Sequence, residues 1–175
     1  MPVRILRPDE LAEVQLVFQG GLEVTRVRII EGSEFPNLIG RIGAWLRGKQ
    51  PPTANAITIR NISYFPRALT GDLTDTGWLM HELTHQWQYQ HDGIGYLVEA
   101  IFAPTYVYAP PDTPPGTALK EFSKAGKKFR DFNREQQGDI VRDYYFTLKQ
   151  NQDVSGWESY IQEVRTPVKE SPRPA

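Results

Sequence analysis

The sequence lacks cysteine altogether, and its 175 residues include only three histidines. Without cysteine there is no disulfide framework, no thiolate zinc site, no iron–sulfur cluster and no cysteine nucleophile. The three histidines, His81, His85 and His91, all lie within one short segment. Any zinc site in this chain must therefore draw its side-chain ligands from histidines and carboxylates.

The chain also lacks an excess of either charge, because 20 basic and 21 acidic side chains give a net charge of −1. No run of five or more like charges occurs, so we expect no nucleic-acid partner. The chain has no stretch of about 18 apolar residues, and acidic residues stand early where a signal peptide would be apolar. We expect a soluble protein without membrane partner or export signal. It would reside in the cytoplasm or be delivered by a secretion apparatus that needs no signal peptide.

The length is typical of one domain, and no linker or internal repeat divides it. We predict a single domain over residues 1–165, followed by a disordered tail over residues 166–175. The tail is polar and rich in proline, so it cannot bury enough apolar surface to order itself.

The apolar spacing predicts helices and a small sheet, which together indicate an α+β fold. A helix should begin at Pro8 and end before Gly20, and a second long helix should run from about Thr76 to Gln90 with Thr74 and Asp75 as its cap. The other predicted elements are a strand over Leu22–Ile30, a helix over Asn37–Arg47, a strand or hairpin over Ala56–Phe65 that bends near Arg60 and Asn61, an irregular proline-rich loop over Ala109–Thr117, and a helical region over Ala118–Gln150 with Gly126 and Gly138 as candidate interruptions.

The most informative segment is His81-Glu82-Leu83-Thr84-His85, which falls on the second long helix. Residues four apart on a helix lie about 6 Å from each other on one face, so both imidazoles can reach one metal ion. Glu82 lies about 100° around the helix from His81, beside the metal rather than on it. There its carboxylate can take a proton from a metal-bound water.

A catalytic zinc usually has three protein ligands and one open position, so a third ligand is needed. His91 follows His85 by six residues and should point to a different face. Carboxylates are therefore the candidates. If the helix over residues 118–150 is continuous, its apolar stripe at Phe122, Ala125, Phe129 and Phe132 leads to Glu135 and Asp139. A buried carboxylate is costly without a compensating positive charge, which zinc would supply. Glu99 and Glu121 remain alternatives to Glu135.

The pattern H-E-x-x-H followed by Glu135-Gln136-Gln137-Gly138-Asp139 resembles the gluzincin group of zinc peptidases. The resemblance implies that His81, His85 and Glu135 hold Zn²⁺ and that Glu82 is the general base. It further implies that Asp139 orients His81 by a hydrogen bond to the other ring nitrogen.

A second resemblance covers Pro8 to Tyr145, on the runs VFQGGLEVTRVRII, AITIRNISYF, HELTHQWQYQ and REQQGDIVRDYY. These runs look like small bacterial metallopeptidase domains of the Vgr-related or Rhs-associated kind, found near type VI secretion genes. The resemblance implies a minimal zincin-like fold, with a small N-terminal sheet, an active-site helix and a second ligand-bearing helix. A histidine expected after the strand in some of these domains is replaced here by Ile30-Glu31.

The sequence thus predicts a zinc-dependent peptidase that hydrolyses peptide or protein substrates. An extended substrate would pair with the open edge of the strand over Ala56–Phe65. The oxyanion would need a donor, for which the candidates are Tyr64, Tyr106, Tyr108, Tyr144 and Tyr145. Two alternatives stay open: a zinc-binding but non-catalytic accessory module of a type VI (Vgr/Rhs) secretion system, and a metal-free interaction domain.

Overall fold

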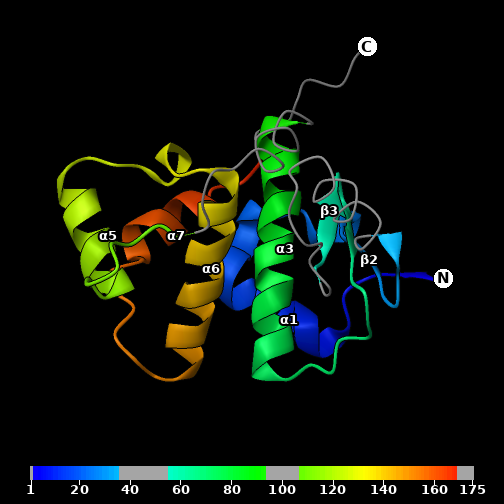
Figure 1. Ribbon diagram of the computed structural model, residues 1–175. Coiled ribbons are helices and arrows are strands. Elements are labelled where there is room, and N and C mark those ends of the chain that lie inside the picture. Colours follow the sequence, from blue (N-terminus) through cyan, green and yellow to red (C-terminus); the bar gives the residue numbers. More distant parts are fainter. Residues whose placement is uncertain (1, 36–54, 94–106, 169–175) are drawn as a thin grey trace, which may run out of the picture.

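The computed structural model of the chain describes residues 2–35, 55–93 and 107–168 (Figure 1). These residues form a small sheet and several helices, which confirms the predicted α+β class. The helices are α1 (Pro8–Phe18), α3 (Leu73–Asp92), α5 (Pro115–Lys124), α6 (Arg134–Lys149) and α7 (Glu158–Val164), with single 3₁₀ turns at Gln19–Gly21, Val24–Arg26 and Phe129–Asp131. The predicted helix over Asn37–Arg47 and most of the predicted tail lie outside the described residues.

Four short strands make the sheet, in the order β1-β2-β4-β3. They are β1 (Val3–Arg4), β2 (Arg28–Ile30), β3 (Ile57–Ile59) and β4 (Ile62–Tyr64). The pair β2–β4 is parallel, whereas β1–β2 and β3–β4 are antiparallel. The predicted hairpin is confirmed, because β3 and β4 pair antiparallel, and Arg60 in the turn between them takes a positive φ of 58°. In the described part of the chain β3 pairs only with β4, so it is the last strand on its side, as expected.

The predicted strand over Leu22–Ile30 is too long, because only Arg28–Ile30 is strand. Residues Val24–Arg26 form a 3₁₀ turn instead. The Glu23 N–H donates to the side chain of Gln90 on α3, and pairing with the β4 hairpin begins where Arg28 N–H donates to Asn61. Tertiary contacts therefore override the local β propensity of this segment.

Helix α3 begins earlier than predicted and is capped by Asp72 rather than by Thr74 and Asp75. The Asp72 carboxylate accepts the N–H of Asp75 at 2.8 Å. Asp75 itself is buried and accepts from both Arg67 and Thr70. The helix ends at Gly93, whose φ of +73° favours glycine.

The predicted helical region over Ala118–Gln150 contains two helices, α5 and α6. The prediction of an interruption near Gly126 is therefore confirmed, and that of a continuous apolar stripe was wrong. Gly126 takes a φ of +86° just after α5, which ends the helix there, while Gly138 lies inside α6 without breaking it. The loop before α5 is shorter than the predicted Ala109–Thr117, since the helix already begins at Pro115. Phe122 and Phe132 still pack together, with ring centroids 6.0 Å apart, but from separate segments.

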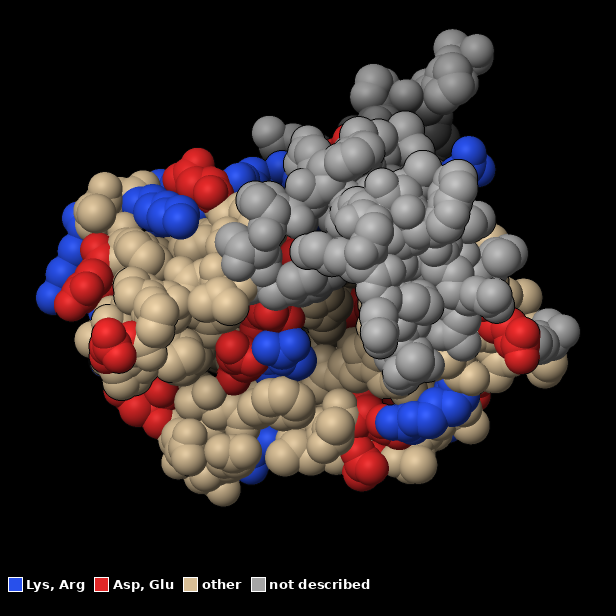
Figure 2. Space-filling view, in the orientation of Figure 1, with Lys and Arg blue, Asp and Glu red and all other residues tan. Residues whose placement is uncertain are grey.

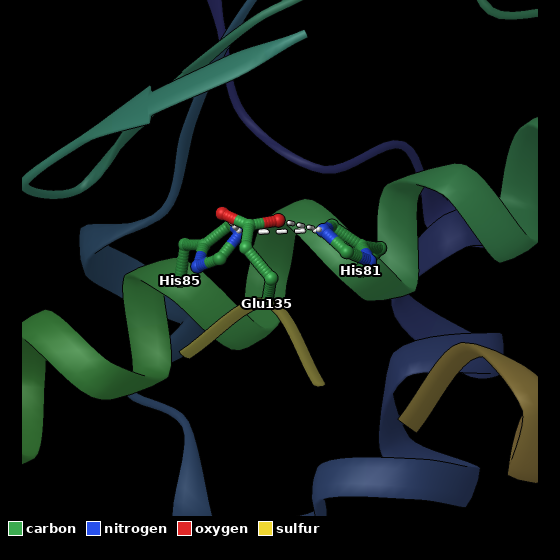
Figure 3. A group of neighbouring side chains, drawn as sticks. All are labelled: His81, His85 and Glu135. Carbon is green, nitrogen blue, oxygen red and sulfur yellow. Dashed lines mark hydrogen bonds and ion pairs between the residues drawn. The ribbon is translucent and has the colours of Figure 1, made fainter. Parts of the chain in front are cut away.

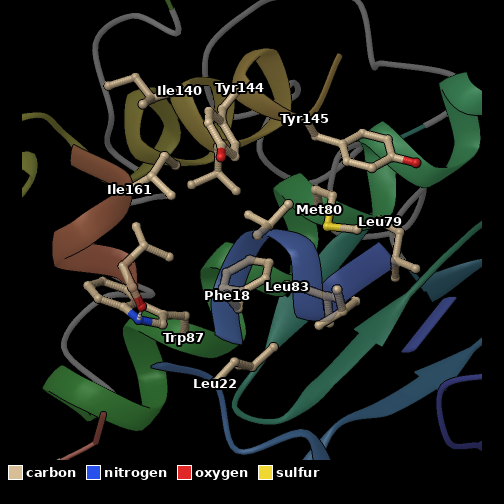
Figure 4. Close-up of a cluster of buried hydrophobic side chains, with 14 of the residues drawn as sticks. Phe18, Leu22, Leu79, Met80, Leu83, Trp87, Ile140, Tyr144, Tyr145 and Ile161 are labelled. Carbon is tan, nitrogen blue, oxygen red and sulfur yellow. Dashed lines mark hydrogen bonds between the residues drawn. The ribbon is translucent and has the colours of Figure 1, made fainter. Parts of the chain in front are cut away.

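Helix α3 lies in the middle of the molecule, with α6 along one side and the sheet on the other (Figure 1). The buried side chains of α1, α3, α6 and α7 form one apolar cluster around it (Figure 4). Trp87 on α3 is fully buried there, and its indole N–H donates to the carbonyl of Val164 at 2.9 Å. This packing fixes the position of α3 against α6, the two helices that carry the predicted ligands.

No described helix combines the length and the apolar character that crossing a bilayer requires. On the face shown in Figure 2, acidic and basic side chains are interspersed over the described surface.

Candidate metal centre

Three predicted ligands come together where α3 and α6 touch. His81 and His85 lie one turn apart on α3, and Glu135 lies in the first turn of α6, with its carboxylate between the two imidazoles (Figure 3). His81 Nε2 lies 3.3 Å from His85 Nε2 and 3.3 Å from Glu135 Oε2, and His85 Nε2 lies 3.5 Å from Glu135 Oε1. One donor atom from each residue falls within 4.8 Å of the others, so the group could hold a metal ion.

The start of α6 explains why Glu135 lies at this point. Asn133 caps the helix by accepting the N–H of Gln136 at 2.9 Å, and the Gln136 side chain accepts the N–H of Asn133 in return. This reciprocal cap fixes the first turn of α6, and therefore Glu135, against α3.

The group is buried, with exposed fractions of 8% for His81, 6% for His85 and 9% for Glu135. Burial alone lowers the pKa of His81, but hydrogen bonds with Asp139 and Glu135 outweigh burial and raise it to about 10. Burial alone raises the pKa of Glu135, but the two histidines outweigh it and hold that pKa well below its usual range. Two ring nitrogens and a carboxylate that converge out of water match the donor set of an open zinc site.

Asp139 occupies the place expected of an orienting carboxylate. Its Oδ1 lies 2.9 Å from His81 Nδ1, the ring nitrogen that faces away from Glu135 and His85. The same oxygen accepts from Arg142 at 2.6 Å, so the carboxylate is held from its own helix. Gly138, which directly precedes Asp139 on α6, faces the imidazole of His81.

Glu82 is buried next to the three ligands, and its carboxylate faces the sheet. The Thr58 hydroxyl on β3 donates to Glu82 Oε2 at 2.7 Å. Because that hydrogen is used, the neighbouring Ser63 hydroxyl donates to Thr58 at 2.7 Å, and the Gln86 amide donates to Ser63 at 2.8 Å. The strand next to the helix therefore fixes one oxygen of the predicted general base.

The other predicted candidates do not join this group. His91 stacks on Trp87 with centroids 4.3 Å apart, and its Nε2 lies 2.9 Å from the carbonyl of Gly21, away from the ligands. Burial lowers its pKa. Glu121 is exposed on α5, and Glu99 lies outside the described residues.

The candidate oxyanion donors lie in different surroundings. Arg165, directly after α7, donates to the Tyr144 hydroxyl, and the Tyr145 hydroxyl donates to Glu13 on α1. Both tyrosines therefore hold α6 to neighbouring segments. Tyr64 packs on Phe35 with centroids 5.1 Å apart, and Tyr106 lies outside the described residues. Tyr108 donates to Asp143 at 2.8 Å, one turn along α6 from Asp139. Burial and the Asp143 carboxylate raise the pKa of Tyr108.

The sequence alone did not point to Thr58, Gln88 or Gly138, each of which touches a predicted site residue, nor to Gln137, which bonds to Gln88. Gln88 follows His85 by three residues, a spacing that places two side chains on one helix face. The other three contacts depend on how α3 packs against β3 and α6.

A pocket of about 500 Å³ lies between α5, α6 and the segment before α7. Its lining includes Asp143, Lys120 and Trp157 but none of the predicted ligands, so it is separate from the metal group.

Comparison with known proteins finds relatives that are named for type VI secretion. No model of a known protein family matches it. Over 89 residues it is 35% identical to the type VI secretion system spike protein VgrG2b of Pseudomonas aeruginosa, a match that covers 47% of this chain and 8% of that protein. A solved structure, the effector domain of Pseudomonas aeruginosa VgrG2b, matches with a TM-score of 0.57 and 26% identity. The match covers 95% of this chain and 84% of that domain.

The chain is similar to one effector domain along almost its whole length. This confirms the Vgr-related resemblance expected from the sequence. The sequence match spans less than a tenth of the full spike protein, and the structural match is to its effector domain.

Proposed function

We propose that this chain is an effector-type module of a type VI secretion apparatus that hydrolyses peptide bonds with a bound zinc ion. The likeness to the VgrG2b effector domain supports the link to secretion. The single observation that carries the chemistry is the buried convergence of His81, His85 and Glu135 beside Glu82.

In this proposal His81, His85 and Glu135 hold the zinc ion, and Asp139 keeps the ring of His81 in place. When bound, zinc lowers the pKa of a coordinated water and polarises the carbonyl of the substrate. Glu82 takes the proton of the attacking water, while the Thr58 hydroxyl holds the carboxylate through Oε2. Glu82 then gives that proton to the leaving amine.

The last strand of the sheet supports a peptide as the substrate. Strand β3 packs against α3, and Thr58 joins it directly to Glu82. An extended chain that pairs with β3 would therefore run past the general base.

A second candidate is a zinc-binding accessory module without catalysis, in which the metal stabilises the fold. The specific observation in its favour is the 35% identity to a protein named as a spike component. The two candidates differ in turnover and agree on metal binding.

The test compares the wild-type chain with Glu82→Gln in zinc content and in cleavage of an unstructured protein such as casein. Glu121→Gln, an exposed glutamate on α5, is the matched control. We expect all three proteins to bind one zinc ion, and only Glu82→Gln to lose cleavage. Zinc binding without wild-type cleavage favours the accessory module, and equal cleavage by Glu82→Gln contradicts the proposed mechanism.

A further inference from the structure

His85 is held by a neutral amide, unlike His81, whose second nitrogen meets a carboxylate. Gln88 Oε1 lies 2.9 Å from His85 Nδ1, one turn along the same helix. An amide oxygen can only accept, so His85 Nδ1 must carry the hydrogen. This hydrogen bond leaves His85 Nε2 as the metal-binding nitrogen.

The orientation of the Gln88 side-chain amide is fixed by two acceptors on its nitrogen. Its Nε2 lies 3.0 Å from the carbonyl of Arg134 and 3.0 Å from Gln137 Oε1. Turning the amide over would place its oxygen against the main-chain acceptor and leave His85 facing a donor. Gln88 is fully buried, so no water could relieve that conflict at low cost.

The direction of Gln137 is fixed in turn by the main chain. Its Nε2 donates to the carbonyl of Phe132 at 2.8 Å, which turns Oε1 toward Gln88. Gln137 is only 1% exposed. Two backbone carbonyls at the start of α6 thus determine, through two buried amides, which nitrogen of His85 carries the hydrogen.

We propose that Gln88 and Gln137 are positioning residues that set the tautomer and ring orientation of His85 for metal binding. The proposal rests on the zinc site proposed above. Gln88 also bonds the carbonyl of the residue before Glu135. The same amide therefore couples the ring of His85 to the helix turn that carries the third ligand.

The arrangement is built into the packing of α3 on α6. Gln88 follows His85 by three residues, and Gln137 lies between Glu135 and Asp139 on α6. The site would then be oriented on both sides: Asp139 supports His81, and the two amides support His85.

The experiment measures zinc affinity by competition with a chelator in the full chain, for Gln88→Leu, Gln137→Leu and the double variant. Loss of a residue that orients a metal-bound histidine typically costs about 10- to 100-fold in metal affinity. We expect that loss for Gln88→Leu and a smaller loss for Gln137→Leu. The double variant should lose no more than Gln88→Leu, because Gln137 acts through Gln88.

The matched control is Gln90→Leu, on the same helix, which removes amide bonds to Glu23 and Asn61 far from the ligands. It should keep the wild-type zinc affinity even if the protein unfolds more easily. Gln137→Leu, which leaves Gln88 next to His85, keeps the test valid if Gln88→Leu does not fold.

A second readout separates positioning from general stability. With three histidines in the chain, imidazole ¹H–¹⁵N spectra of the zinc-loaded protein can be assigned residue by residue. We expect a slowly exchanging Nδ1 hydrogen on His85 in the wild type and in Gln90→Leu, and its loss in Gln88→Leu. Wild-type zinc affinity together with an unchanged Nδ1 signal in Gln88→Leu would overturn the inference and leave the zinc site standing. A wild-type chain that binds no zinc would overturn both.

Discussion

Gly138 faces the ring of His81 so closely that a Cβ at this position would lie 2.7 Å from ring atom Cε1 and 2.8 Å from Nδ1. A side chain at residue 138 would therefore push the His81 ring out of its present position. Glycine inside a helix costs about 1 kcal/mol relative to alanine. Here the glycine allows the His81 ring to lie against the backbone of α6.

Gly138→Ala should weaken zinc binding by at least about tenfold, because the new methyl group displaces the His81 ring. Competition with a chelator measures the affinity, and circular dichroism checks the helix content. Gly20→Ala is the control, since a Cβ there meets only Pro167 at 3.8 Å. Wild-type affinity in Gly138→Ala would show that the ring does not need this space.

Thr58→Val removes the hydroxyl that donates to Glu82 Oε2 but keeps the shape of the side chain. A hydrogen bond to a charged group contributes about 1.5–3 kcal/mol, so kcat should fall about 10- to 100-fold if the bond is needed in the transition state. Zinc content should not change. Thr58→Ser, which restores the hydroxyl, should recover most of the rate, and equal rates for all three proteins would refute a role for Thr58.

The pH dependence of stability should show the ion pair that anchors the start of α3. The hydrogen bond with Arg67 holds the pKa of Asp75 well below its usual range, and bonds from Thr70 add to it. A carboxyl with a lowered folded-state pKa stabilises the fold above its unfolded pKa of about 4, and this stability is lost as the pH falls toward the folded value.

Asp75→Asn should therefore lower the free energy of unfolding by about 2 kcal/mol at pH 7, and by clearly less near pH 3. Urea unfolding at both pH values measures the difference. Asp9→Asn, at a carboxylate that is 70% exposed, should have little effect at either pH. A constant loss for Asp75→Asn at both pH values would contradict the assigned ion pair.

Metal removal should destabilise the fold, because His81, His85 and Glu135 join two helices. A ligand present at 100 times its Kd adds about 2.7 kcal/mol to the stability of the folded state. Adding a chelator should lower Tm, and adding zinc should restore it. The Tm of His81→Ala should not change with either reagent. A wild-type Tm that stays the same with both reagents would argue against a metal in this site.

The part of the site that lies on one helix could be predicted from the sequence. His81 and His85 are four residues apart, so helical geometry alone predicted that both imidazoles lie on one face and that His91 points to another. Glu135 was proposed from a stripe through Phe122 and Phe129 on one continuous helix, and that helix does not exist. The structure nevertheless places Glu135 beside the two histidines.

Features that depend on packing between elements could not be predicted. Thr58 reaches Glu82 because β3 lies on α3, and Gln137 reaches Gln88 because α6 lies against α3. Asp72 caps α3, while Asp75 pairs with Arg67. These two residues are eight positions apart in the sequence, and helix-capping rules do not include such a contact.

In the proposed mechanism His81, His85 and Glu135 hold a catalytic zinc ion next to Glu82. A crystal structure of the zinc-loaded chain, with anomalous data collected on both sides of the zinc absorption edge, tests it most directly. We predict one zinc peak bound by His81 Nε2, His85 Nε2 and the Glu135 carboxylate, with a fourth position open to water. A zinc ion bound elsewhere, or no peak between α3 and α6, would contradict the claim.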